Sequence, residues 1–128
     1  MSKLTARVPY FLAKPCASAD VVEHAALYYH ATDANTLTLA AGSGSTLRFA
    51  GFARFGRATA NLPVEFAPMG EDIAIASAAI AVGDPLESYG TAGKVRTKAS
   101  GGGTVIGYAL TAAAADGDLV LVDIVKTS

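Results

Sequence analysis

The sequence divides into two similar halves, each made of short apolar segments that glycine-containing bends separate. Residues 79–125 contain runs rich in Val and Ile, and Gly, Asp or Pro bounds each run. This pattern of short apolar runs between turn-forming residues is typical of β-strands connected by tight turns. A weaker version of the same plan occurs at residues 20–67, so the chain is predicted to contain two degenerate copies of one β unit.

The two copies correspond segment by segment. Gly51 precedes Leu62 by 11 residues and Gly107 precedes Leu119 by 12 residues, so the spacing is nearly the same in both copies. The matched segments are 26–28 with 85–87, 36–38 with 94–96, 42–45 with 100–103, 46–53 with 104–109, and 62–66 with 119–123. The third of these pairs is predicted to form bends, and the others are predicted to form strands.

One run of aromatic residues requires a choice between helix and strand. Phe49, Phe52 and Phe55 recur every three residues, as they would on one face of a helix. Gly51 lies inside this run and disfavours a helix, so we predict a strand that is kinked at this glycine. Pro63 closely follows and limits the next segment to an edge strand.

Residues 20–32 have two interpretations. Asp20 followed by Glu23 resembles the capping box at the start of a helix, which favours a short helical turn at residues 20–24. The valines and tyrosines of the same segment favour a strand. We predict a strand here and keep the helical turn as the alternative.

Residues 1–18 are predicted to form an extended N-terminal arm, ahead of a single β domain at residues 19–128. Pro9 and Pro15 disfavour a helix in the arm. Basic residues are mixed there with aromatic and apolar ones. Extended termini of this composition pack either on a neighbouring subunit or on the core of their own chain.

Charge and composition narrow the classes of partner. The chain has 10 Lys and Arg residues against 11 Asp and Glu, for a net charge of −1. This balance removes the usual electrostatic reason to bind nucleic acid or an anionic membrane. Only 16% of residues are charged and 52% are hydrophobic, so burial against other protein subunits is predicted. The sequence has neither a signal-peptide pattern nor an apolar run of membrane-spanning length, and we expect synthesis in the cytoplasm.

No residue pattern predicts catalysis, a cofactor or a metal. His24 and His30 are six positions apart and lack the spacing of a zinc site. The glycine-rich residues 42–45 are not followed by the Lys and Ser or Thr of a phosphate-binding loop. Cys16 is the single cysteine, which excludes an internal disulfide. We therefore expect a non-enzymatic protein that needs no cofactor or metal.

Parts of the second copy resemble a known family. The Ala-Ile-Ala-Val-Gly-Asp run at residues 79–84, the Ile-Gly-Tyr-Ala run at residues 106–109, and the alanine run with Gly-Asp-Leu-Val at residues 112–120 resemble the bacteriophage capsid cement, or head decoration, proteins. The resemblance implies a small β-barrel or β-tulip-like sandwich without catalysis, which binds the outer surface of an expanded head and bridges capsomers. The implied partners are the major capsid protein and further copies of the chain, as a homotrimer or alternatively a dimer, on virions assembled in the host cytoplasm.

Two segments are predicted to contact the capsid or another subunit, because both mix basic and apolar residues outside the strongest strands. These are the arm at residues 3–12 and the loop at residues 54–61. The candidate contact residues are Lys3, Arg7, Tyr10, Phe11, Leu12, Arg54, Phe55 and Arg57. A wider basic set is expected to form salt contacts with a protein partner: Arg48, Arg54, Arg57, Arg96 and Lys98.

A second class of function competes with this one. Aromatic residues line sugar sites, so the chain could be a carbohydrate- or host-binding β module of a virion tail or fibre. The candidates for such a site are Tyr28, Tyr29, Phe49, Phe52 and Tyr89. The sequence contains no Trp, which disfavours this alternative.

Overall fold

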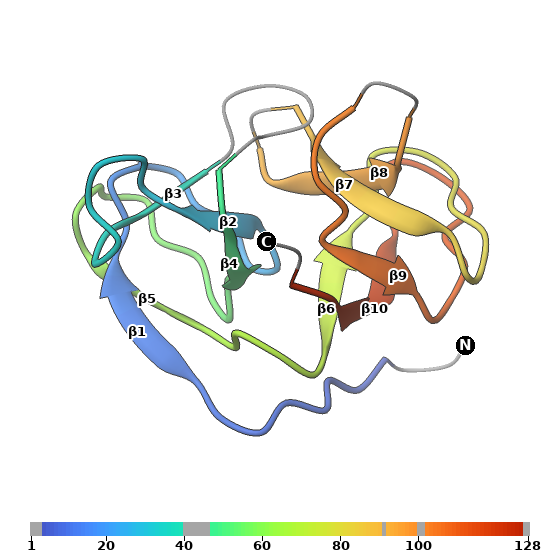
Figure 1. Ribbon diagram of the computed structural model, residues 1–128, viewed down its shortest axis with the longest axis horizontal. Coiled ribbons are helices and arrows are strands. Elements are labelled where there is room, and N and C mark those ends of the chain that lie inside the picture. Colours follow the sequence, from blue (N-terminus) through green and yellow to red (C-terminus); the bar gives the residue numbers. More distant parts are fainter. Residues whose placement is uncertain (1–3, 40–46, 91, 100–101, 127–128) are drawn as a thin grey trace.

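The residues that the structure describes form ten short β-strands, which Figure 1 shows as a ribbon. The computed structural model describes residues 4–39, 47–90, 92–99 and 102–126. These residues include no helix, and therefore none long and apolar enough to cross a membrane. The prediction of an all-β protein is confirmed.

The strands pair antiparallel in three sheets. Their bounds are β1 (Leu12–Pro15), β2 (Ala26–Tyr29), β3 (Leu37–Leu39), β4 (Phe49–Phe52), β5 (Pro63–Phe66), β6 (Glu71–Ile75), β7 (Pro85–Tyr89), β8 (Lys94–Thr97), β9 (Gly107–Ala109) and β10 (Leu119–Ile124). The sheets have the orders β1-β5, β3-β2-β4 and β6-β10-β9-β7-β8. Over the described ranges no sheet closes on itself, so a β-sandwich describes the fold and a closed barrel does not.

The pairing of the first five strands is repeated by the last five. β1 pairs with β5 as β6 pairs with β10, and β2 lies between β3 and β4 as β7 lies between β8 and β9. Two parallel bridges also correspond, Cys16 with Leu37 and Ala76 with Val95. The predicted construction from two degenerate repeats is therefore confirmed. We call β1–β5 the first unit and β6–β10 the second unit.

Each unit begins one strand earlier than the sequence repeat indicates. β1 belongs to the segment predicted as an extended arm, and β6 lies between the two predicted repeats. Pro15 is compatible with pairing because it stands at the end of β1, opposite Pro63 at the start of β5, where prolines are tolerated in sheets. The predicted bends at residues 42–45 and 100–103 fall wholly or partly outside the described residues.

The turns that lead into β5 and β10 have the same geometry. Asn61 and Gly117 have positive φ values of 68° and 92°. Their N–H groups donate to the carbonyl oxygens of Cys16 and Ala76, at 2.6 and 2.8 Å. Left-handed backbone costs most L residues about 1–2 kcal/mol, whereas Gly adopts it freely and Asn tolerates it. Each unit therefore has the same type of turn, with Asn at the left-handed position in the first unit and Gly in the second.

We expect Gly117→Ala to lower the free energy of unfolding by about 1–2 kcal/mol. An added Cβ at Gly117 meets nothing within 4 Å, so the cost comes from the backbone alone. The matched substitution Asn61→Gly is expected to leave the free energy of unfolding unchanged or slightly higher. Urea denaturation followed by circular dichroism measures both, and a Gly117→Ala variant as stable as the wild type would contradict the argument.

Two hydrophobic cores lie on opposite faces of the sheet β3-β2-β4, because side chains along a strand alternate between faces. The larger core joins the two units and includes Tyr28, Phe49, Phe52, Leu86, Ile106 and Val122. The smaller core lies within the first unit and includes Cys16, Leu27, Leu37, Val64 and Phe66. The central strands β2 and β4 are therefore buried on both faces, which explains their continuous apolar sequences. Figure 1 shows the first unit on the left and the second on the right.

Candidate interaction surfaces

The predicted arm and the predicted loop meet beside β5. Tyr10, Phe11 and Leu12 are 47%, 39% and 38% exposed. The guanidinium of Arg54 lies 4.4 Å from the centre of the Phe11 ring, and its Nη1 lies 2.7 Å from Oε1 of Glu65. We call these five residues the arm–loop face.

Strand pairing explains how segments more than forty residues apart in the sequence come together. Ala13 pairs with Glu65 in the β1–β5 ladder, which fixes the arm on one side of β5. The backbone N–H of Arg54 donates to the carbonyl oxygen of Glu65 at 2.8 Å, which fixes the loop on the other side. β5 therefore positions both predicted contact segments at its edges.

The remaining predicted contact residues have different surroundings. Phe55 is half-buried under the guanidinium of Arg57, which lies 4.6 Å from the ring centre and donates through Nε to the carbonyl oxygen of Pro63. Arg7 forms a backbone bridge with Glu71, and its side chain is exposed. Lys3 lies outside the described residues. Of the eight predicted residues, Phe11 and Arg54 form the direct contact between arm and loop.

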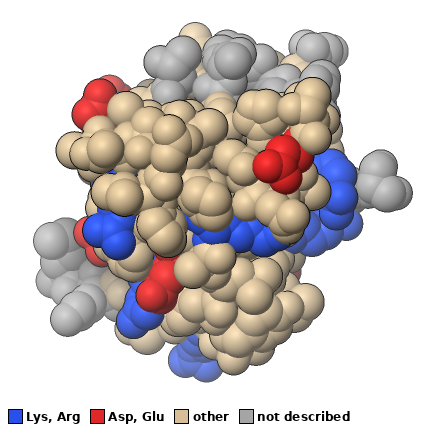
Figure 2. Space-filling view, turned by 90° about the vertical axis from the view of Figure 1, so that its left-hand side faces the viewer, with Lys and Arg blue, Asp and Glu red and all other residues tan. Residues whose placement is uncertain are grey.

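Basic side chains extend beyond the arm–loop face. Figure 2 shows a band of Lys and Arg side chains across the side of the molecule that is on the left in Figure 1, with single acidic side chains next to it. Exposed aromatic and basic residues together suit a partner surface that is apolar and acidic.

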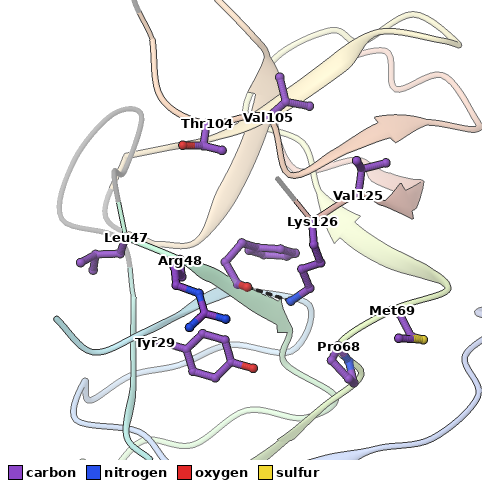
Figure 3. A pocket seen from close by; sticks show the side chains of 10 residues that line it. Tyr29, Leu47, Arg48, Pro68, Met69, Thr104, Val105, Val125 and Lys126 are labelled. Atoms are coloured by element: carbon purple, nitrogen blue, oxygen red, sulfur yellow. Dashed lines mark hydrogen bonds between the residues drawn. The ribbon is translucent and has the colours of Figure 1, made fainter. Parts of the chain in front are cut away.

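A pocket lies between the two units, and we call it the inter-unit pocket. Its volume is about 670 Å³. Residues from both units and from the connection between them line the pocket. They are Tyr29, Leu47, Arg48, Phe49, Pro68, Met69, Thr104, Val105, Val125 and Lys126. Figure 3 shows the side chains of Tyr29, Arg48 and Lys126 directed toward one another in this pocket.

Lys126 is held against β4 by backbone oxygens. Its Nζ donates to the carbonyl oxygens of Phe49 and Ala50 at 2.7 and 2.6 Å. Burial, together with the charge of Arg48, lowers the pKa of Lys126 to about 8. Arg48 was in the predicted basic set, whereas Lys126 was missed. Its position depends on the fold, which brings the end of the second unit against a strand of the first.

A third surface carries apolar side chains on the outside of the largest sheet. Ile73 pairs with Leu121 and Ile75 pairs with Leu119, whose side chain is 44% exposed. The opposite face of β6 buries Asp72 and Ala74 instead. We call the residues on the outside the outer apolar face: Ile73, Ile75, Tyr108, Leu110, Leu119 and Leu121.

The fold and these surfaces define a small all-β protein with exposed faces suited to contacts with other proteins. The chain belongs to the phage cement protein family, which matches residues 34–124. It is therefore a phage structural protein that associates with the capsid, and the resemblance noted from the sequence is confirmed.

One solved structure supports the fold. The head fiber gp8.5 N base of bacteriophage phi29 is similar, with a TM-score of 0.67 and 23% sequence identity, over 93% of this chain and 98% of that chain. None of the curated proteins matches the chain.

Proposed function

We propose that the protein binds the outer surface of the expanded phage head and stabilises the contacts between capsomers. Membership of the cement family carries this proposal. The similarity of its fold to the base of a head fiber supports a location on the head. The proposed role is structural and needs no catalysis or cofactor.

The arm–loop face is the proposed contact with the major capsid protein. It combines exposed aromatic and aliphatic side chains with an arginine, the residue types enriched where proteins bind one another. Burial of apolar area stabilises such a contact by roughly 25 cal/mol per Å² before the costs of association. Many copies on one lattice then strengthen modest single contacts.

The outer apolar face is the proposed contact between copies of the chain. Along the paired strands β6 and β10, Leu119 is exposed, and Ile73, Ile75 and Leu121 are half-buried. We propose a homotrimer at three-fold positions of the head, with a dimer at two-fold positions as the alternative. Analytical ultracentrifugation of the purified protein distinguishes the two by mass.

Cosedimentation with expanded, undecorated heads tests the main proposal. We expect saturable binding at a fixed number of copies per capsomer, and this number identifies the symmetry position. A protein that stays in the supernatant at all concentrations would contradict the proposal. Binding to glycans in a glycan array would then favour the carbohydrate- or host-binding alternative.

Phe11→Ala is expected to weaken binding to heads about tenfold, because aromatic anchors carry much of the energy of protein interfaces. The ring is exposed, so the free energy of unfolding should change by less than about 1 kcal/mol. Tyr89→Ala is a matched control, because Tyr89 is 40% exposed and its ring lies 4.1 Å from the guanidinium carbon of Arg96. Equal effects of the two substitutions on head binding would exclude the arm–loop face as the contact.

A deletion of the arm is a less specific test. We predict that removal of residues 1–12 weakens attachment to the head while the β domain stays folded. The same deletion also removes the bridge between Arg7 and Glu71 and the first residue of β1, paired with Phe66. The single substitution of Phe11 therefore separates binding from stability better than the deletion does.

A further inference from the structure

We propose that the inter-unit pocket binds a carboxylate on an extended segment of a partner protein, with Arg48 and Lys126 as the groups that hold it. The proposal rests on the proposed function, since the partner it implies is the capsid protein. It adds the chemical nature of one contact: the capsid protein would supply an acidic side chain flanked by apolar side chains.

Positive charge is concentrated at the wall of this pocket. Arg48 and Lys126 line it and lie 5.3 and 5.9 Å from the centre of the Tyr29 ring, and Lys14, which is outside the lining, lies 5.6 Å from the same centre. Like charges at this spacing repel one another, and an anion between them removes the repulsion.

No carboxylate of the described residues forms an ion pair with Arg48 or Lys126. Two other arginines of the described chain do have such a partner, since Arg54 pairs with Glu65 and Arg96 pairs with Glu87. Asp33 lines the neighbouring hollow, where its carboxylate already accepts hydrogen bonds from residues 35 and 36. Within the described residues, no carboxylate therefore competes with one from a partner for the cations of the pocket.

The donors that would hold the carboxylate are oriented by the chain itself. Lys126 uses two of its three N–H donors on the carbonyl oxygens of Phe49 and Ala50, which leaves one for a ligand. The guanidinium carbon of Arg48 lies 5.3 Å from the centre of the Tyr29 ring, and the N–H groups of an arginine can bind a carboxylate bidentately. A carboxylate at this position would also stabilise the charged form of Lys126.

The rest of the pocket selects for a protein segment over a free inorganic anion. Its wall includes Leu47, Phe49, Met69, Val105 and Val125, which offer apolar contacts around the cations. A ligand that fills the pocket therefore combines one negative charge with apolar neighbours, as an acidic residue between two large aliphatic residues does.

Titration of the ¹⁵N-labelled full chain with two short peptides tests the proposal by NMR. The probes are acetyl-Leu-Glu-Leu-amide and its neutral counterpart acetyl-Leu-Gln-Leu-amide. We expect the glutamate peptide to bind about tenfold more tightly and to shift the amide signals of residues that line the pocket. Equal affinity for both peptides, or shifts confined to other parts of the chain, would overturn the proposal.

Arg48→Gln supplies the matched variant. It should reduce affinity for the glutamate peptide about tenfold and leave that for the glutamine peptide unchanged. Arg57→Gln, at an arginine bonded to a backbone oxygen of its own chain, should change neither. The NMR spectrum of each variant shows whether it is folded, and a folded Arg48→Gln that binds the glutamate peptide as the wild type does would overturn the proposal.

Cosedimentation of the wild type and Arg48→Gln with heads separates this proposal from the proposed function. A wild type that binds the glutamate peptide but not heads contradicts the capsid role and leaves the carboxylate site standing. A wild type that binds heads but discriminates no peptide contradicts the carboxylate site alone.

Discussion

Glu87→Gln is expected to lower the free energy of unfolding by about 3–5 kcal/mol, the effect of breaking a buried ion pair from one side. Glu87 is fully buried. Its carboxylate accepts hydrogen bonds from Nε of Arg96 at 2.8 Å and from the backbone N–H groups of Ala99 and Gly103 at 3.1 and 2.6 Å. The glutamine side chain keeps the shape but loses the charge and half of the acceptor capacity, so Arg96 is left without its counter-ion.

The pH dependence of stability follows from the same contacts. Burial on its own would raise the pKa of Glu87, but the hydrogen bonds from Ala99, Arg96 and Gly103 and the charge of Arg96 outweigh it, and the pKa lies below its ordinary value. A carboxyl whose pKa is lower in the folded state stabilises the fold above its unfolded pKa, about 4.3 for Glu. This contribution is lost as the pH falls through the folded-state pKa. The difference between wild type and Glu87→Gln should therefore be complete at pH 7 and shrink in acid.

Glu65→Gln is the matched control. Glu65 and Arg54 are 2.7 Å apart, as close as the buried pair, but their side chains are 37% and 54% exposed. Exposed pairs contribute about 0–1 kcal/mol, so the loss of this one should change the free energy of unfolding by less than about 1 kcal/mol. Urea denaturation of both variants at neutral and acidic pH measures the difference. If the two substitutions cost the same at pH 7, the buried pair does not have the role assigned to it.

The sequence was sufficient to predict the strands and their duplication, because both depend on local patterns. Glycine-rich bends mark the ends of strands wherever they occur. Gly51 and Gly107, predicted as equivalent from their spacing, do occupy equivalent places, opposite Leu27 in β2 and Leu86 in β7. Phe11 of the arm and Arg54 of the loop lie in contact with each other, which the sequence did not predict, and their contact with the capsid stays a prediction.

The register of the last strands was predicted one residue out of step. The sequence comparison makes Val64 equivalent to Leu121. In the structure, Val64 pairs with Lys14, and Val120 pairs with Ala74 in the same way, so Val64 is equivalent to Val120. A shift of one residue moves every side chain of a strand to the other face. Alternation in a sequence defines two faces but does not say which one is buried.

Long-range contacts explain what else the sequence could not provide. Glu87 lies between Leu86 and Ser88 in β7, and three donors bind its buried carboxylate: Arg96 in β8 and the backbone N–H groups of Ala99 and Gly103, which follow β8. Lys126 contacts β4 only because the larger core brings the two units together. Neither residue has a local pattern that marks its role.

Gly51→Ala is expected to lower the free energy of unfolding by about 3 kcal/mol or more, the upper range for overpacking a buried site. An added Cβ at Gly51 would meet the carbonyl oxygen of Ala67 and the ring of Phe66. At the equivalent Gly107, a Cβ would lie 2.5 Å from the carbonyl oxygen of Asp123 and from a methyl group of Val122. Backbone atoms cannot rotate away as a side chain does, so the strands must separate in both variants.

The strands of the two glycines differ in burial, and this difference determines which substitution lowers the free energy of unfolding more. Gly51 lies in β4, which is buried between both cores, whereas Gly107 lies in a sheet with one exposed face. Arg48 of the inter-unit pocket directly precedes β4, and Arg54 of the arm–loop face follows it by two residues. We therefore expect Gly51→Ala to destabilise more than Gly107→Ala, and both more than Gly117→Ala, where the cost is only that of the backbone. Urea denaturation of the three variants measures this order, and a Gly51→Ala variant no less stable than Gly117→Ala would show that β4 can move away from β5 without disturbing either core.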